Sequence, residues 1–187
     1  MPSLSEQWNA LKVVVEDMER LLPDIEKVTE VFVKQLQEGK KVLSCGNGGS
    51  ASDAMHIAEE LVGRYRGDRK SLPAIALTAD GTSITCIAND WSYDEVFSRQ
   101  IEGLGSEGDL LIAFTTSGNS SNILKAIEQA KAQGMITIAL LGKDGGQAKA
   151  MADHSIVVPS HDTARIQELH TWILHVFLEA VEAAFLK

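Results

Sequence analysis

The spacing of apolar residues in the N-terminal region predicts two amphipathic helices. The first apolar seam alternates spacings of four and three residues and consists of Leu4, Trp8, Leu11, Val15, Met18 and Leu22. Pro23 is expected to end this helix, and a second helix is expected over 24–37, before Gly39. So regular a seam suits either packing on a core or contact between subunits. We favour an oligomer interface formed by residues 1–38.

Beyond Lys40 the pattern changes to short, continuous apolar runs that alternate with amphipathic segments. The runs predict strands over 42–45, 74–77, 110–114, 136–141 and 154–158. The segments predict helices over 51–62, 82–88, 95–104, 121–133 and 163–186, with Asp80 and Asp94 as N-caps of the second and third. Continuous apolar strands between helices are typical of a parallel sheet covered on both faces. We therefore predict one α/β domain, residues 1–187, with a doubly wound, flavodoxin-like, five-stranded parallel sheet and an N-terminal helical extension.

Composition narrows the function classes. The 187 residues include 17 Lys and Arg against 26 Asp and Glu, a net charge of −9, which argues against direct nucleic-acid binding. No apolar run approaches the roughly 18 residues of a membrane helix, and the first residues lack the basic and apolar regions of a signal peptide. Cys45 and Cys86 lie in apolar segments, as expected of reduced thiols. We expect a cytoplasmic protein without membrane association.

Two loops have the composition of a phosphate site. One is Gly46-Asn47-Gly48-Gly49-Ser50 and the other is Thr115-Thr116-Ser117-Gly118-Asn119-Ser120-Ser121. Each follows a predicted strand and enters a helix, where glycines, hydroxyls and free N–H groups suit an anion. Neither matches the nucleotide P-loop or the dinucleotide pattern. Either loop alone could be a simple helix cap, but two at equivalent places favour a neutral cradle for a sugar phosphate.

Ionisable groups on two helices are candidates for the chemistry. His56 and Glu60 are four residues apart and share one helix face, whereas Glu59 is expected to be solvated. The last helix carries Gln167, Glu168, His170 and His175 amid an apolar stripe. Helical spacing alone does not choose between its two histidines. Each of these groups, taken singly, is also explained as a surface pair or a satisfied polar group of the core.

Three further motifs have weaker signals. Asn89-Asp90 either closes a turn or faces the pocket. Arg64-Tyr65-Arg66, with Arg69 and Lys70, is a small basic cluster that we interpret as a solvated loop rather than a phosphate guide. Asp144-Gly145-Gly146 is a turn to which we assign no chemical role.

At these positions the sequence resembles the phosphoheptose isomerases, within the sugar isomerase (SIS) domain superfamily. The resemblance covers about 42–175 in the family's order. It rests on Ser44-Cys45-Gly46-Asn47-Gly48-Gly49-Ser50, Asp53-Ala54-Met55-His56, Ala58-Glu59-Glu60-Leu61, Gly63-Arg64-Tyr65-Arg66, Asn89-Asp90, Thr116-Ser117-Gly118-Asn119-Ser120, Gly142-Lys143-Asp144-Gly145-Gly146 and Arg165-Ile166-Gln167-Glu168.

The resemblance implies an aldose–ketose isomerase of the SIS fold that works through an enediol. Its substrate would be sedoheptulose 7-phosphate and its product D-glycero-D-manno-heptose 7-phosphate, at the first step toward the heptose of bacterial lipopolysaccharide. It also implies a homotetramer with active sites at subunit junctions, and one zinc ion in each subunit.

The resemblance also implies a role for each matching residue. Glu60 would be the general base and His175 the partner acid/base. Phosphate would be held by Ser50, Thr115, Ser117 and Ser120. The rest of the substrate would be lined by Asn47, Gly48, Gly49, Asn89, Asp90, Thr116 and Gln167. Zinc would be held by His56, Glu60, Gln167 and His175. A carboxylate bound tightly to zinc is a weaker base, so Glu60 as ligand and Glu60 as base are in tension.

The sequence departs from the family pattern at two places, and one alternative function is open. Ala51-Ser52 stands where some relatives carry His-Cys, and Ala164 where some carry an acid, which bears on rate and substrate preference. The alternative is a non-catalytic tetramer of the same fold that binds the bacterial replication initiator. A scaffold has no need of His56, Glu60, Gln167 and His175 together, so their presence favours the isomerase. A sugar-phosphate-sensing transcription factor would need a DNA-binding domain, which we do not expect here.

Overall fold

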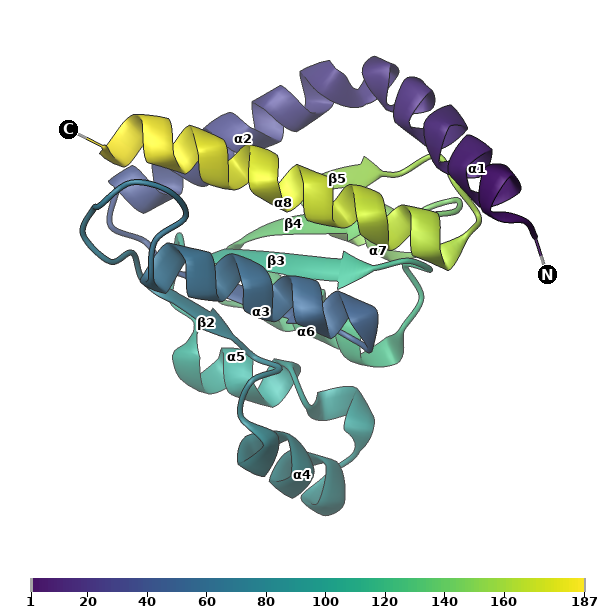
Figure 1. Cartoon of the computed structure of the whole chain (residues 1–187). Helices are drawn as coiled ribbons and strands as arrows, with labels where there is room; N and C mark the ends of the chain where they lie inside the picture. Colours follow the sequence, from purple (N-terminus) through teal and green to yellow (C-terminus); the bar gives the residue numbers. More distant parts are fainter. Residues whose placement is uncertain (1, 187) are drawn as a thin grey trace.

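A computed structural model describes residues 2–186 (Figure 1). Met1 and Lys187, the two ends of the predicted domain, lie outside the described residues. Five parallel strands form one sheet in the order β2-β1-β3-β4-β5. They are β1 (Val42–Gly46), β2 (Ala74–Ala76), β3 (Leu110–Thr115), β4 (Ile136–Leu141) and β5 (His154–Val157). This order confirms the predicted flavodoxin-like, doubly wound sheet.

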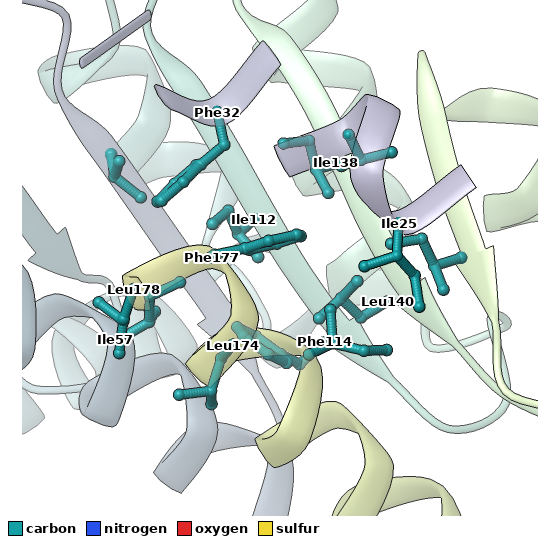
Figure 2. Packing of buried hydrophobic residues seen from close by; sticks show 14 of the residues in the cluster. Ile25, Phe32, Ile57, Ile112, Phe114, Ile138, Leu140, Leu174, Phe177 and Leu178 are labelled. Atoms are coloured by element: carbon teal, nitrogen blue, oxygen red, sulfur yellow. The ribbon is translucent and has the colours of Figure 1, made fainter. Parts of the chain in front are cut away.

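Helices cover both faces because alternate strand residues point to opposite sides. Ile112 joins one apolar cluster and its neighbour Leu111 the other. The first face is covered by α1 (Leu4–Asp17), α2 (Leu22–Gln37), α3 (Gly49–Val62) and α8 (Thr163–Phe185). The second is covered by α4 (Gly81–Asp90), α5 (Ser98–Leu104), α6 (Ser121–Ala132) and α7 (Ala148–Met151). Figure 2 shows the first core, where Phe32 and Phe177 stack with ring centroids 5.2 Å apart.

The N-terminal helices differ from the prediction at their junction. Helix α1 ends at Asp17, a 3₁₀ turn (η1, Met18–Leu21) follows, and Pro23 lies in the first turn of α2. Proline suits that place because it has no N–H to leave unpaired and its φ is already helical. Of the predicted seam, Met18 is buried, whereas Leu4, Trp8, Val15 and Leu22 are 46–83% exposed. Most of the seam is therefore free to contact a second surface.

The predicted caps have opposite outcomes. Asp80 caps α4, because its carboxylate accepts the backbone N–H of Thr82 at 2.9 Å. Asp94 is not a cap, since a 3₁₀ turn (η2, Tyr93–Glu95) intervenes and α5 begins only at Ser98. Helix α7 was not predicted. Both cysteines are free, with Cys45 buried and Cys86 exposed.

The parallel strands bring distant loops to one edge of the sheet. The loops after β1 and β3 both leave from carboxyl ends of neighbouring strands, the place where such sheets bind ligands. Within residues 2–186, none of the helices is both long enough and apolar enough to span a bilayer.

Candidate active site

A polar cavity of about 240 Å³ opens where the loops after β1 and β3 meet the start of α8. Eight predicted loop residues line it: Asn47, Gly48, Gly49, Ser50, Thr115, Thr116, Ser117 and Ser120. The first turns of α8 supply two more lining residues, Gln167, which was predicted, and Thr163, which was not. The structure therefore assembles the predicted cradle from three segments distant in sequence.

The cradle suits an anion without a basic side chain. Helices α3 and α6 begin beside the cavity, so the positive ends of their dipoles lie there. No Lys or Arg of the described residues lines the cavity. A Cβ on Gly49 would lie 2.7 Å from Nε2 of Gln167, so the glycine lets Gln167 pack directly on the loop. Such a site would hold a phosphate by hydrogen bonds.

A side-chain network that the sequence did not indicate joins the two loops. Asn47 and Asn122 exchange amide hydrogen bonds of 2.9 and 2.8 Å. Tyr93 donates its hydroxyl hydrogen to Oδ1 of Asn47 at 3.0 Å. Because Asn122 is buried in the first turn of α6, the pair holds the loop after β1 against the loop after β3.

A second cluster lies farther along α3 and α8, which pack side by side (Figure 1). Nε2 of His56 is 3.5 Å from Oε1 of Glu60. The His56 ring also meets the His175 ring edge-on, with centroids 5.1 Å apart. Tyr65 stacks on His175 at 5.8 Å. Glu60 and His175, far apart in the sequence, are therefore connected through His56.

Burial distinguishes the two histidines that helical spacing could not. His170 is fully buried, and its Nε2 donates to the carbonyl oxygen of Leu141 at 3.0 Å. Burial lowers the pKa of His170 to about 4. His175 is only partly buried and contacts His56. His170 is thus a group of the core, bonded through Nε2 while its buried Nδ1 has no partner among the described residues, and His175 is the histidine at the candidate site.

Asp53 is a buried carboxylate to which the sequence reasoning assigned no role. Its Oδ1 accepts a hydrogen bond from Oγ1 of Thr171 at 2.8 Å, whereas Oδ2 has no partner. Burial raises the pKa of Asp53, although the Thr171 hydroxyl and the nearby His56 act in the opposite direction. The contact joins α3 to α8 between the cavity and the histidine cluster.

The donor set near His56 fits a zinc ion. Ligand atoms of His56, Glu59 and Glu60 lie within 4.8 Å of one another, and Glu59 is exposed, as predicted. Imidazole and carboxylate are ligands that zinc prefers. The ring of His175 contacts that of His56, but His175 is not part of this group of ligand atoms. Gln167 lies instead against Gly49, in the lining of the cavity.

Asn89 and Asp90 are the predicted residues that the structure does not bring to the cavity. They are exposed at the end of α4 and bond to each other, Nδ2 to Oδ1, at 2.8 Å. Tyr93, three residues farther on, does reach Asn47. The turn that follows α4 therefore approaches the cradle through a different side chain.

The basic cluster is not a fully solvated loop, contrary to the prediction. Arg64, Arg66 and Lys70 are exposed, but the side chain of Arg69 is only 1% exposed and pairs with Glu182. Tyr65 is partly buried against His175. Burial of the charge is possible because Glu182 supplies its partner.

Known proteins of similar sequence match most of this chain. A family model described as "SIS domain" matches residues 8–142. A phosphoheptose isomerase of Fusobacterium nucleatum is 49% identical over 180 residues, which cover 96% of this chain and 92% of that protein. This chain belongs to the phosphoheptose isomerase family. Phosphoheptose isomerase 1 of Campylobacter jejuni is 46% identical and covers 97% of this chain and 98% of its own.

A solved structure confirms the fold of this family member. The phosphoheptose isomerase of Neisseria gonorrhoeae superposes with a TM-score of 0.91 at 37% identity, over 96% of this chain and 97% of that one. The predicted resemblance, the SIS fold and the enzymatic nature of the chain are confirmed. The chain is a sugar-phosphate isomerase, and the non-catalytic alternative is not favoured.

Proposed function

We propose that this enzyme interconverts sedoheptulose 7-phosphate and D-glycero-D-manno-heptose 7-phosphate. The observation that carries the proposal is the order of sites along α8, with Gln167 at the anion cavity and His175 at the Glu60 cluster. The two residues are eight apart, roughly 12 Å along the helix axis. A long, extended sugar phosphate can place its anionic end at the first site and its carbonyl end at the second.

The phosphate is held at the cavity by hydroxyls and helix N-termini. Ser50, Thr115, Ser117 and Ser120 supply the hydroxyls, and Asn47, Thr116 and Gln167 face the adjoining carbons of the sugar. Asn89 and Asp90 are proposed as further sugar contacts, because Tyr93, in the turn that follows them, bonds to Asn47 at the cavity. Binding at this end orients the carbonyl toward α3 and α8.

Glu60 and His175 move the protons. Glu60 removes the proton from C1 of the ketose, and His175 transfers a hydroxyl proton between O1 and O2 as the enediol forms and collapses. Return of a proton to C2 yields the aldose, so atoms and electrons balance within the substrate. The partly buried surroundings of both groups limit competing water.

Zinc is proposed as the cofactor. His56, Glu60 and His175 would hold it, with Gln167 as the fourth ligand that the family resemblance implies. When bound, the ion would stabilise negative charge that develops on the sugar oxygens. Gln167 packs on Gly49 in the cavity lining, so it also has a place in substrate binding.

A homotetramer is proposed for the assembly. A groove of about 770 Å³ between α2 and α8 is lined by Leu22, Trp172 and Val176 among others. Leu22 and Trp172 also line a smaller cavity together with Leu11 and Val15 of α1. Large exposed apolar surfaces of this kind mark interaction sites. We further propose a cytoplasmic enzyme at the first step toward the heptose of bacterial lipopolysaccharide.

The test is turnover of sedoheptulose 7-phosphate by the purified protein, followed as formation of the aldose. Glu60→Gln and His175→Ala should each lower kcat by about 10²- to 10⁴-fold, because each removes one proton-transfer group. Both variants should keep the oligomeric state of the parent. Glu128→Gln, the same chemical change at an exposed position of α6, should retain full activity. No turnover with or without added zinc would favour the non-catalytic tetramer.

A further inference from the structure

Arg69 connects the helix that carries Glu60 to the helix that carries His175. It lies between α3 and β2, and its side chain is 1% exposed. Nη2 donates to the carbonyl oxygen of Glu60 at 2.7 Å, and Nη1 donates to that of Leu61 at 3.0 Å. These carbonyls belong to the last turn of α3, where backbone acceptors have no partner within the helix. Arg69 therefore caps α3 at the residue proposed as the base.

The same guanidinium reaches α8. Nε of Arg69 donates to Oε1 of Glu182 at 2.7 Å, and Oε2 of Glu182 accepts the backbone N–H of Gly67 at 2.9 Å. The side chain of Glu182 is 4% exposed and lies seven residues after His175 on α8. Both partners are thus buried and fully bonded to one another and to the backbone.

The geometry of arginine makes this contact a rigid one. A guanidinium is planar and presents its donors as a fixed fork, unlike the single rotating ammonium of lysine. The planar guanidinium of Arg69 therefore fixes the position of the Glu60 carbonyl relative to the Glu182 carboxylate. The anion cavity lies at the opposite, N-terminal end of α3 and has no contact with this brace.

We propose that Arg69 is a positioning residue that holds Glu60 and His175 in register for proton transfer. This inference rests on the proposed function. The neighbouring Tyr65, which stacks on His175, comes from the same connection between α3 and β2 and adds to the constraint. Binding of the phosphate end is independent of Arg69.

The principal test is Arg69→Lys, which keeps the charge and the pairing with Glu182 but removes the fork. Misplacement of catalytic groups by an ångström can lower a rate on the order of 100-fold. We expect kcat to fall by about that factor, with KM for the sugar phosphate and Kd for inorganic phosphate unchanged. Glu182→Gln should lower kcat in the same direction and serves if the first variant does not fold.

Asp109→Asn is the matched control for loss of stability. Asp109 is buried, pairs with Lys41 and accepts the backbone N–H of Ser106 at 2.8 Å, just before β3 and without contact to Arg69 or Glu182. Asp109→Asn should lower Tm by about 10 °C, because it removes the charge of a largely buried ion pair. Arg69→Lys keeps its charge and should lower Tm by no more than this. Only Arg69→Lys should lower kcat. Normal kcat in Arg69→Lys, a raised KM with unchanged kcat, or an equal loss of kcat in Asp109→Asn would overturn the inference.

A readout without activity separates this inference from the proposed function. In Arg69→Lys the ring NMR signals of His175 should shift, while those of the exposed His161 should not. Asp109→Asn should leave both sets unchanged. An unmoved His175 signal contradicts the inference even if the parent turns over substrate. A parent without turnover contradicts the proposed function, and the NMR comparison still decides the role of Arg69.

Discussion

Burial and partners, rather than residue type, decide what each polar side chain of α8 can do. His170 is enclosed by the core beside Phe114 and bonded to the carbonyl of Leu141, so its ring is kept neutral. His175, five residues later, meets His56 and Tyr65 at a partly open position. The same residue type therefore supports the fold at one position and the proposed proton transfer at the other.

The neutral His170 predicts a pH-dependent stability. Its pKa falls from 6.5 to about 4 on folding, so between these values the unfolded chain binds the proton and the folded chain does not. The free energy of unfolding should therefore decrease as pH falls from about 6.5 toward 4, by about 3 kcal/mol in total from this group. His170→Phe removes the titrating group and should flatten that part of the profile, measured by urea unfolding at several pH values. An unchanged slope would contradict the assignment.

At the scale of whole elements, the turn after β4 supports the loop after β3. The turn Asp144-Gly145-Gly146, which the sequence analysis left without a role, packs on the loop after β3. The backbone N–H of Ala148 donates to the carbonyl of Gly118 at 3.0 Å, and that of Gln147 donates to Oδ1 of Asn119 at 3.1 Å. The segment after β4 thus supports the loop after β3, which is proposed to hold the phosphate.

Gly146→Ala tests this support. Gly146 has φ +53°, and a Cβ there would lie 2.5 Å from the carbonyl oxygen of Ser117. The loop after β3, which is proposed to hold the phosphate, must move to make room for the added methyl group. KM should therefore rise on the order of tenfold with little change in kcat. Gly39→Ala is the control, because Gly39 also has a positive φ, +78°, but nothing within 4 Å of its Cβ. Gly39→Ala should lower the free energy of unfolding without a change in KM. Equal KM values in the two variants would contradict the proposed support of the loop after β3 by the turn after β4.

At the scale of the whole molecule, α1, α2 and α8 together present one uncovered apolar surface. Trp172 is 39% exposed and lines both the groove between α2 and α8 and a smaller cavity beside Leu11 and Val15. Leu4, Trp8 and Val15 extend the surface along α1. Tryptophan at the centre of such a surface contributes strongly to association.

Trp172→Glu should therefore dissociate the proposed tetramer. A charge at this position would be buried without a partner in the assembly, which is strongly unfavourable. We expect light scattering to report a smaller species at micromolar concentration, while circular dichroism reports an intact fold. Trp172→Phe preserves the apolar contact and should preserve the parent mass. An unchanged mass for Trp172→Glu would place the interface elsewhere.

The local features of this enzyme can be predicted from its amino-acid sequence. Alternation of apolar runs and helical seams predicted the five strands, and the Gly- and Ser-rich loops after β1 and β3 predicted an anion site at the carboxyl ends of these strands. These features are readable because strand, helix and turn geometry depend on neighbours along the chain. Local exceptions arose where another local conformation competed, as at Pro23 in the first turn of α2 and at Asp94 in a 3₁₀ turn.

The division of the polar side chains between sites depends instead on how the helices pack. It placed Gln167 against Gly49, joined His175 to His56, enclosed His170 in the core and buried Arg69 between α3 and α8. These outcomes depend on the distance and rotation between two helices that pack on the same sheet face. Helical spacing fixes which residues share a face of one helix, whereas the facing residue of the next helix is set by the packing of the whole core.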